Sequence, residues 1–249
     1  YYLNMVANEM FLDTALQRAS VISQAKALNY TPQSAIAPTA TINVVFNNIT
    51  TSSFTLPAYT PFLSSAINGV NYNFLSDNSY TVNVTNNTAI FPNVEIKQGT
   101  QGSYSYVVDS VANPTYTFEI PDNTVDTTTL FVSVQTSISN SAYDIYTFAD
   151  EYLSLNKDSK VYFLQESVGG YYEVYFGNGI IGKKLTDGNI VRLSYLTTSG
   201  TSSYGANSFV IMGPVGTYSN TSVTPIASSN AGSAKESISS IKFQAPKAY

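Results

Sequence analysis

The chain has 249 residues, of which 11 are basic and 16 acidic, and it contains no His, Cys or Trp. These absences exclude Ser-His-Asp and Cys-His catalysis, zinc sites built from Cys and His, and disulfides. The net charge of −5, with Lys183–Lys184 as the only adjacent basic pair, argues against binding to nucleic acid or an anionic membrane, since both need clustered cations. No run of 18 apolar residues occurs, so we expect no membrane-spanning helix.

Residues 5–28 are predicted to form one amphipathic helix. Apolar residues recur there at steps of three and four, which places them on one helical face. They are Leu12, Ala15, Leu16, Ala19, Ile22, Ala25 and Leu28. Asn29 tolerates the left-handed conformation that ends many helices, and Pro32 opposes continuation. We therefore predict that residues 1–38 are a helical segment at the end of a preceding domain.

Short β-strands are predicted throughout residues 39–213. Alternating runs rich in Val, Ile, Thr, Tyr and Phe are separated by turn sequences such as Asn-Gly, Asp-Asn and Gly-Thr. The expected strands cover 39–46, 53–57, 70–75, 80–85, 89–96, 104–109, 115–120, 129–135, 144–148, 160–165, 171–176, 190–195 and 208–212. A boundary at Ala112-Asn113-Pro114 divides them into two β domains, residues 39–111 and 112–213. Each is expected to be a sandwich or barrel of short antiparallel strands.

The last part of the chain, residues 214–249, is predicted to be a connector followed by the start of a further helical domain. Residues 214–232 are rich in Ser, Thr, Gly and Asn, which is typical of exposed loops. Ser233 and Glu236 match the capping box S-x-x-E, with Ile238 and Ile241 behind them and Pro246 at the end. The fold class is therefore mainly β, with an N-terminal amphipathic helix and a C-terminal helix.

A glycine-rich stretch follows the predicted strand 171–176. Gly177, Gly179 and Gly182 satisfy G-x-G-x-x-G, but a dinucleotide site also needs a helix that begins at the last glycines. Here a turn at Asp187–Gly188 and another strand follow. A phosphate-binding P-loop would need Ser or Thr where Lys184 stands. We therefore expect these glycines to supply positive φ angles in tight β connections, and the two lysines to be solvated.

Scattered carboxylates give little support for catalysis or metal binding. A glycosidase needs two carboxylates about 5–9.5 Å apart, and the candidates are Asp122 with Asp126 and Asp150 with Glu151. Asp150, Glu151 and Asp158 could supply oxygen ligands for Ca²⁺, but the EF-hand spacing is absent. We expect no catalytic residue, no metal site, no cofactor and no small-molecule substrate.

Three motifs in order resemble the baseplate J-like family. Residues 171–195 match its hallmark, an aromatic strand, Phe-Gly-Asp/Asn-Gly, further glycines and a strand that ends in Tyr. The turn motif consists of Phe176, Gly177, Asn178, Gly179, Gly182, Asp187 and Gly188, and Tyr195 follows it. A helix leading into Tyr30-Thr31-Pro32 and the segment 232–246 resemble two further family motifs. Within the family, the chain most resembles the baseplate wedge proteins of T-even-like contractile phages.

The resemblance implies a structural, non-enzymatic subunit of a virion tail baseplate, assembled in the host bacterial cytoplasm. Members of this kind pair with copies of themselves, here expected as a homodimer, and bind other wedge subunits. The resulting ring holds the contractile sheath and rearranges to trigger contraction. The resemblance carries over no catalytic residue, because none belongs to the family pattern.

Three readings follow for what the chain binds. Apolar helix residues could form the subunit interface, because an amphipathic face must be covered. The candidates are Leu12, Leu16, Ile22, Leu28, Ile238 and Ile241. The second reading is a tail-associated carbohydrate-binding or glycan-hydrolysing β module, which an exposed line of Tyr beside two close carboxylates would favour. A receptor-binding fibre domain is a third reading, but the trimeric repeats typical of such domains are absent.

Overall fold

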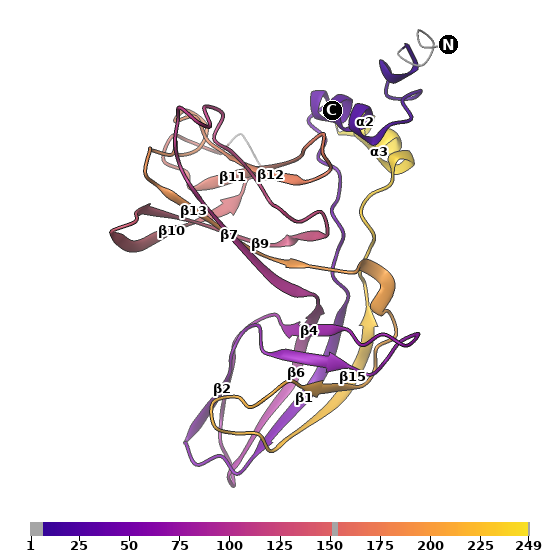
Figure 1. Ribbon diagram of the computed structural model, residues 1–249. Coiled ribbons are helices and arrows are strands. Elements are labelled where there is room, and N and C mark those ends of the chain that lie inside the picture. Colours follow the sequence, from indigo (N-terminus) through magenta and orange to yellow (C-terminus); the bar gives the residue numbers. More distant parts are fainter. Residues whose placement is uncertain (1–6, 151–153, 249) are drawn as a thin grey trace. The chain divides into compact units, whose positions relative to one another are not determined.

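The computed structural model describes residues 7–150 and 154–248, and these fall into two compact units (Figure 1). The first unit contains the residues up to Ser34, the stretch Gly102–Tyr195 and the residues from Lys235 onward. The second contains Ala35–Gln101 and Leu196–Ala234. This grouping differs from the four consecutive segments expected above, because each unit combines stretches that lie far apart in the sequence.

The second unit is built on a six-stranded sheet in the order β14-β3-β4-β6-β1-β15. The same unit also contains a separate two-stranded sheet of β2 and β5. The bounds are β1 Thr39–Asn47, β2 Ser53–Leu56, β3 Pro61–Ser64, β4 Asn73–Ser76, β5 Tyr80–Asn83, β6 Thr88–Gln98, β14 Phe209–Ile211 and β15 Thr221–Asn230, with a 3-10 turn at Gly200–Ser203. The edge strands β14 and β15 contact each other, so the sheet curls into a nearly closed barrel.

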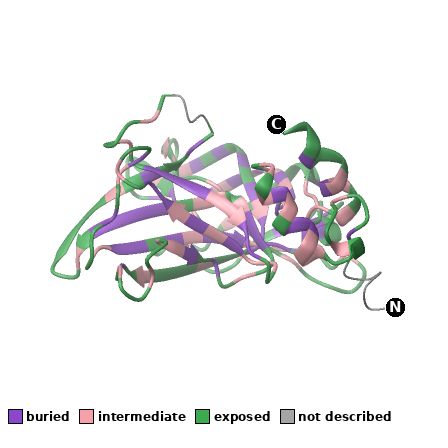
Figure 2. Cartoon of the chain, turned by 90° about the horizontal axis from the view of Figure 1, so that it is seen from above, coloured by how far each residue is buried: buried purple, intermediate pink, exposed green. Residues whose placement is uncertain are grey.

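Strict alternation along β1 builds the core of this second unit. Ala40, Ile42, Val44 and Phe46 are buried, and the residues between them are half-buried. The period of two places successive side chains on opposite faces of the sheet. Figure 2 shows the same banding of buried and exposed residues on other strands. The Phe46 ring packs edge-on at 4.9 Å from Phe54.

The first unit contains a seven-stranded sheet in the order β7-β13-β9-β10-β11-β12-β8. Its strands are β7 Thr100–Val107, β8 Thr117–Glu119, β9 Val125–Ser137, β10 Asn140–Phe148, β11 Val161–Glu166, β12 Tyr172–Phe176 and β13 Ile190–Thr197. The edge strands β7 and β8 meet through Tyr106, whose ring lies 5.3 Å from that of Phe118. The Tyr106 hydroxyl also donates to the carbonyl of Glu119. These contacts bring this sheet close to a closed barrel.

The N-terminal helix is shorter than predicted. Helix α2 covers Arg18–Ala27, and only a short helical turn at residues 7–9 precedes it among the described residues. The carboxylate of Glu9 accepts hydrogen bonds from the backbone N–H groups of Leu16 and Gln17, so the chain turns back instead of continuing one helix. Residues 5 and 6 of the predicted helix lie outside the described residues.

The end of α2 matches the prediction for Asn29. Its φ is 56°, its N–H donates to Lys26, and the N–H of Tyr30 donates to Ala25. This pair of bonds is the Schellman arrangement, which satisfies carbonyls that a helix end would otherwise leave open.

The C-terminal helix α3 spans Ile238–Gln244 and continues into a 3-10 turn at Ala245–Lys247. The predicted capping box is wrong. The N-cap is Ser237, whose side chain accepts from the N–H of Ser240. Ser233 instead exchanges backbone hydrogen bonds with Ile36, so it cannot begin the helix. Helices α2 and α3 pack on each other around Ala15, Val21, Ala25, Ile241 and Ala245.

The predicted fold class, mainly β with two barrel-like sheets and short terminal helices, is confirmed. The predicted connector at 214–232 contains strand β15, which pairs antiparallel with β1. Pro225 is compatible with this strand because β15 lies at the sheet edge. Strand β3 was not predicted either. Strands were expected to be antiparallel, but β10 pairs parallel with β11 over two residues. No helix among the described residues is long and apolar enough to cross a membrane.

Buried tyrosines predict a loss of stability at alkaline pH. Burial raises the pKa of both Tyr146 and Tyr162 to about 12, from about 10 in the unfolded chain. Between pH 10 and 12 the unfolded chain therefore loses protons that the folded chain keeps, and the free energy of unfolding falls. We expect a loss of about 1 kcal/mol per tyrosine at pH 11.

The measurement is urea unfolding followed by circular dichroism at pH 8 and pH 11. Tyr162→Phe should lose about 1 kcal/mol less than the wild type between these two values, because Phe carries no ionisable proton. Equal pH dependence in the two proteins would contradict this assignment.

Candidate functional site

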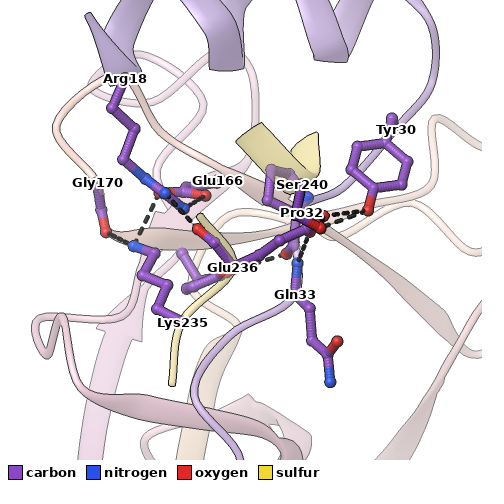
Figure 3. Close-up of polar contacts among 10 residues, drawn as sticks. Arg18, Tyr30, Pro32, Gln33, Glu166, Gly170, Lys235, Glu236 and Ser240 are labelled. Atoms are coloured by element: carbon purple, nitrogen blue, oxygen red, sulfur yellow. Dashed lines mark hydrogen bonds and ion pairs between the residues drawn. The ribbon is translucent and has the colours of Figure 1, made fainter. Parts of the chain in front are cut away.

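A buried carboxylate on the seven-stranded sheet joins three stretches of the first unit. Glu166, the last residue of β11, has no exposed surface. Arg18, the first residue of α2, donates to both of its oxygens at 2.9 Å, through Nε to Oε1 and through Nη2 to Oε2. The Nζ of Lys235 lies 2.8 Å from Oε1. We call Arg18, Glu166 and Lys235 the ion cluster (Figure 3).

Neighbouring carbonyl groups accept further hydrogen bonds from the two cations. Arg18 also donates to the carbonyl of Glu236, and Lys235 donates to the carbonyl of Gly170. A buried charge is costly unless it is paired and hydrogen-bonded. The bidentate geometry of arginine and carboxylate is the strong form of such a pair. The contacts therefore compensate for the burial of the Glu166 carboxylate.

Tyr172 on β12 lies against the ion cluster. The Nζ of Lys235 is 4.9 Å from the centre of the Tyr172 ring, within the range of a cation–π contact. The Tyr172 hydroxyl donates to the carbonyl of Pro32 at 3.0 Å. Burial, and next the charge of Glu166, raise the pKa of Tyr172 far above its usual value. Tyr172 therefore stays neutral and can donate this hydrogen bond across the physiological pH range.

A second carboxylate, Glu236, connects the end of α2 to the start of α3. It accepts from the hydroxyl of Tyr30 at 2.9 Å, the N–H of Gln33 at 2.9 Å and the hydroxyl of Ser240 at 2.7 Å (Figure 3). Burial, and next the hydrogen bond to Glu236, raise the pKa of Tyr30 to about 12. The N–H of Glu236 donates back to the carbonyl of Gln33 at 3.0 Å.

The helix pair and the sheet of the first unit have separate hydrophobic clusters. Polar contacts link the two. Besides the ion cluster, they include the Thr31 hydroxyl on the Leu164 carbonyl at 3.0 Å and a Lys26–Glu173 pair at 3.9 Å. The ion cluster is therefore a structural connection. Sequence analysis missed it because its members are 69 to 217 residues apart and no local pattern joins them.

Gly177 has a steric role in the predicted turn motif, and it does not have the positive φ expected of it. A Cβ atom at Gly177 would lie 2.3 Å from the carbonyl carbon and oxygen of Gly182. Gly179 and Gly182 have φ angles of +89° and +81°, as expected for tight connections. The Asn178 side chain accepts from the N–H groups of Ile180 and Ile181, at 2.9 and 3.1 Å.

The second half of the turn motif attaches the turn before β13 to the loop after β7. The Asp187 carboxylate accepts from both the N–H and the hydroxyl of Ser110 at 2.8 Å. Gly188, with φ +84°, donates its N–H to the carbonyl of Val108 at 2.9 Å. Phe176 is buried at the end of β12, where its ring packs edge-on against Phe118. The motif thus holds turns of the seven-stranded sheet in place.

The side chains of the two lysines reach solvent, and each also contacts a neighbour within the chain. Lys183 pairs with Asp144 at 3.3 Å, and the Nζ of Lys184 lies 5.7 Å from the centre of the Tyr116 ring. Hydrogen bonding to Lys160, and then to Lys183, holds the pKa of Asp144 below its usual value.

The six predicted interface residues occupy different environments. Ile22 and Ile241 are fully buried within this chain. Leu12, Leu28 and Ile238 pack against the cluster between α2 and α3. Leu16 alone is strongly exposed, at 75%. Much of the predicted apolar face is therefore covered by the chain itself.

Two of the candidate catalytic carboxylates accept hydrogen bonds from other residues of this chain. Asp126 is buried and accepts from the N–H and hydroxyl of Thr128. Asp122 accepts from the hydroxyl of Tyr195 at 3.0 Å. Glu151 lies outside the described residues. Within residues 7–150 and 154–248, no group of three acidic side chains could hold a metal ion.

Removal of the charge on Glu166 tests the ion cluster. In Glu166→Gln two cations lose their shared anion, and we expect the free energy of unfolding to fall by about 3 kcal/mol. The measurement is urea unfolding at neutral pH. Glu119→Gln, an exposed site on β8, is the matched control and should change stability by less than about 0.5 kcal/mol. Equal effects of the two substitutions would refute the role of the cluster.

A pair of glycine substitutions separates steric from conformational requirements in the turn motif. Gly177→Ala forces a Cβ into backbone atoms, and we expect a loss of about 2–3 kcal/mol. Gly188→Ala meets no atom within 4 Å and only adopts a positive φ, which costs about 1 kcal/mol. Thermal unfolding of both variants measures the difference. A milder effect at Gly177 than at Gly188 would contradict the close approach.

Comparisons with known proteins show what the chain is similar to. No family model matches the chain. The chain is 25% identical over 232 residues to the baseplate wedge protein gp6 of Enterobacteria phage T4, covering 83% of this chain and 33% of that protein. It therefore spans about a third of the length of this relative.

Among solved structures, a chain of the anti-feeding prophage (AFP) baseplate, determined by cryo-EM and 6-fold symmetrised, is similar over 99% of this chain and 45% of its own length. The TM-score is 0.34 and the identity 11%. The sequence relationship to T4 confirms the resemblance seen in the three motifs. The chain, which is mostly β, is a distant homologue of a phage baseplate wedge protein.

Proposed function

We propose that the chain acts in a structural subunit of a contractile tail baseplate wedge. In this role it associates with itself and with other wedge subunits to form the ring that holds the sheath. Rearrangement of that ring would then trigger contraction. The observation that carries the proposal is the relationship to the T4 baseplate wedge protein, which extends over 83% of this chain.

The internal connections of the first unit support a mechanical role. Arg18 and Lys235, near the two ends of the described chain, both bind Glu166 on the sheet. The turn motif adds backbone contacts too close to accept a side chain at Gly177. A part that transmits movement between neighbours as a rigid body needs such connections, because interfaces then rearrange while each subunit keeps its own structure.

The candidate carboxylates do not support a carbohydrate module, and four tyrosines are buried where a glycan could not reach them. Tyr146, Tyr162, Tyr172 and Tyr195 are buried within the first unit. The candidate carboxylates Asp122 and Asp126 have hydrogen-bond partners within the chain. We therefore propose the structural role alone.

The direct test locates the full-length protein in virions. Tails are purified and labelled with a gold-conjugated antibody raised against this chain. We expect label at the baseplate end of the tail, and we expect a phage with the gene disrupted to assemble no baseplates. Absence of the protein from purified tails, or normal contractile tails without its gene, would overturn the proposal.

Self-association is a separate part of the proposal and has its own measurement. Sedimentation equilibrium of the purified full-length protein should give a dimer mass. A monomer at all concentrations, together with label at the baseplate, would remove the homodimer and leave the structural role.

A further inference from the structure

A basic surface with an apolar tip lies on two touching loops of the first unit. The loops, 156–160 and 177–184, are joined by hydrogen bonds from the N–H of Gly182 to Asn156 and from the N–H of Lys183 to Ser159. Together they carry two exposed isoleucines and four of the chain's eleven basic residues. We call this set the lysine surface, and it consists of Lys157, Lys160, Ile180, Ile181, Lys183 and Lys184.

From this surface we infer a docking site for an acidic region of a different polypeptide in the baseplate. The inference rests on the proposed function, which it extends by naming a surface and the chemistry of its partner. Three features carry it, namely the excess of cations, the exposed apolar tip and the rigidity of the loop that presents that tip.

The cations outnumber the carboxylates that contact them. Asp144 is shared by Lys160 at 2.6 Å and Lys183 at 3.3 Å. Lys157 pairs with its exposed neighbour Asp158. Lys184 is exposed and lies over the ring of Tyr116. In a chain with a net charge of −5, this local excess of positive charge is complementary to an acidic partner, and such complementarity steers association and sets orientation.

The apolar tip gives the surface a centre that a partner could cover. Ile180 is 74% exposed and Ile181 is 42% exposed. Protein interfaces commonly place an apolar centre inside a charged or polar rim. A solvated turn would need only the lysines, whereas two adjacent isoleucines on the same turn add apolar area that favours burial.

The loop is already ordered before any partner binds. Asn178 accepts from the N–H groups of both isoleucines, and the N–H of Gly179 donates to Gly182. The close approach of Gly177 to Gly182 leaves no room for a side chain. Because the turn that presents the isoleucines is already ordered, binding has a smaller cost in conformational entropy.

An acidic protein fits these observations better than a nucleic acid or a membrane. The lysine surface offers only four cations, on two short loops. Binding to nucleic acid strengthens with each phosphate neutralised. The overall charge of −5 also repels polyanions and anionic bilayers.

Zero-length cross-linking of purified tails tests the inference. A water-soluble carbodiimide couples an amine only to a carboxylate in direct contact, and mass spectrometry then identifies the linked peptides. We expect links from Lys157 or Lys184 to Asp or Glu of another baseplate polypeptide. Links from these lysines only to this chain, or no such links, would overturn the inference. Absence of the chain from the tails would instead refute the proposed function.

Two matched variants of the full-length protein provide the second arm. Lys157→Gln with Lys184→Gln removes two exposed cations from the lysine surface, and Lys97→Gln with Lys247→Gln removes two from elsewhere. We expect the first variant to enter tails about 5- to 10-fold less well in competition with wild type, and the control to match wild type. Equal incorporation of both variants would overturn the inference. So would binding of the wild type, but not the first variant, to phosphatidylglycerol vesicles or duplex DNA at physiological salt.

Discussion

The burial of one carboxylate constrains the architecture of the first unit. Glu166 lies at the end of β11 without exposed surface, and a lone charge there would be prohibitively costly. Its two counter-ions are Arg18, at the start of α2, and Lys235, in the segment just before α3. The sheet can therefore keep Glu166 only if both terminal segments lie against it. This requirement explains why the helices, which have a hydrophobic cluster of their own, are held to the sheet by polar contacts.

The turn motif solves a different problem in the same unit. Strands β12 and β13 are joined by a stretch that must reverse twice without a helix to support it. Gly177 permits backbone contact, Asn178 satisfies the N–H groups at the loop tip, and Asp187 attaches the second turn to Ser110. The motif is therefore explained by the close backbone contact and by the side-chain hydrogen bonds that hold its turns. The same geometry holds Ile180 and Ile181 at the surface.

Local patterns predicted most of this fold, and long-range contacts account for the rest. Alternation identified strands such as β1, because one face of that strand is buried at every second residue. Strand β15 was missed because its residues are mostly exposed, so pairing with β1 defines it and no alternation marks it. The helix 5–28 was predicted too long because Glu9 intercepts two N–H groups ahead of α2. The ion cluster had no local signal, since its residues meet only after folding.

Hydrogen exchange of the native protein, read by mass spectrometry, tests the central claim that the Glu166 carboxylate holds α2 and α3 on the sheet. Comparing Glu166→Gln with Glu119→Gln, the account predicts at least about tenfold faster exchange in α2 and α3 for the first variant, with β1 and β6 unchanged. Identical exchange of the two helices in both variants would contradict it.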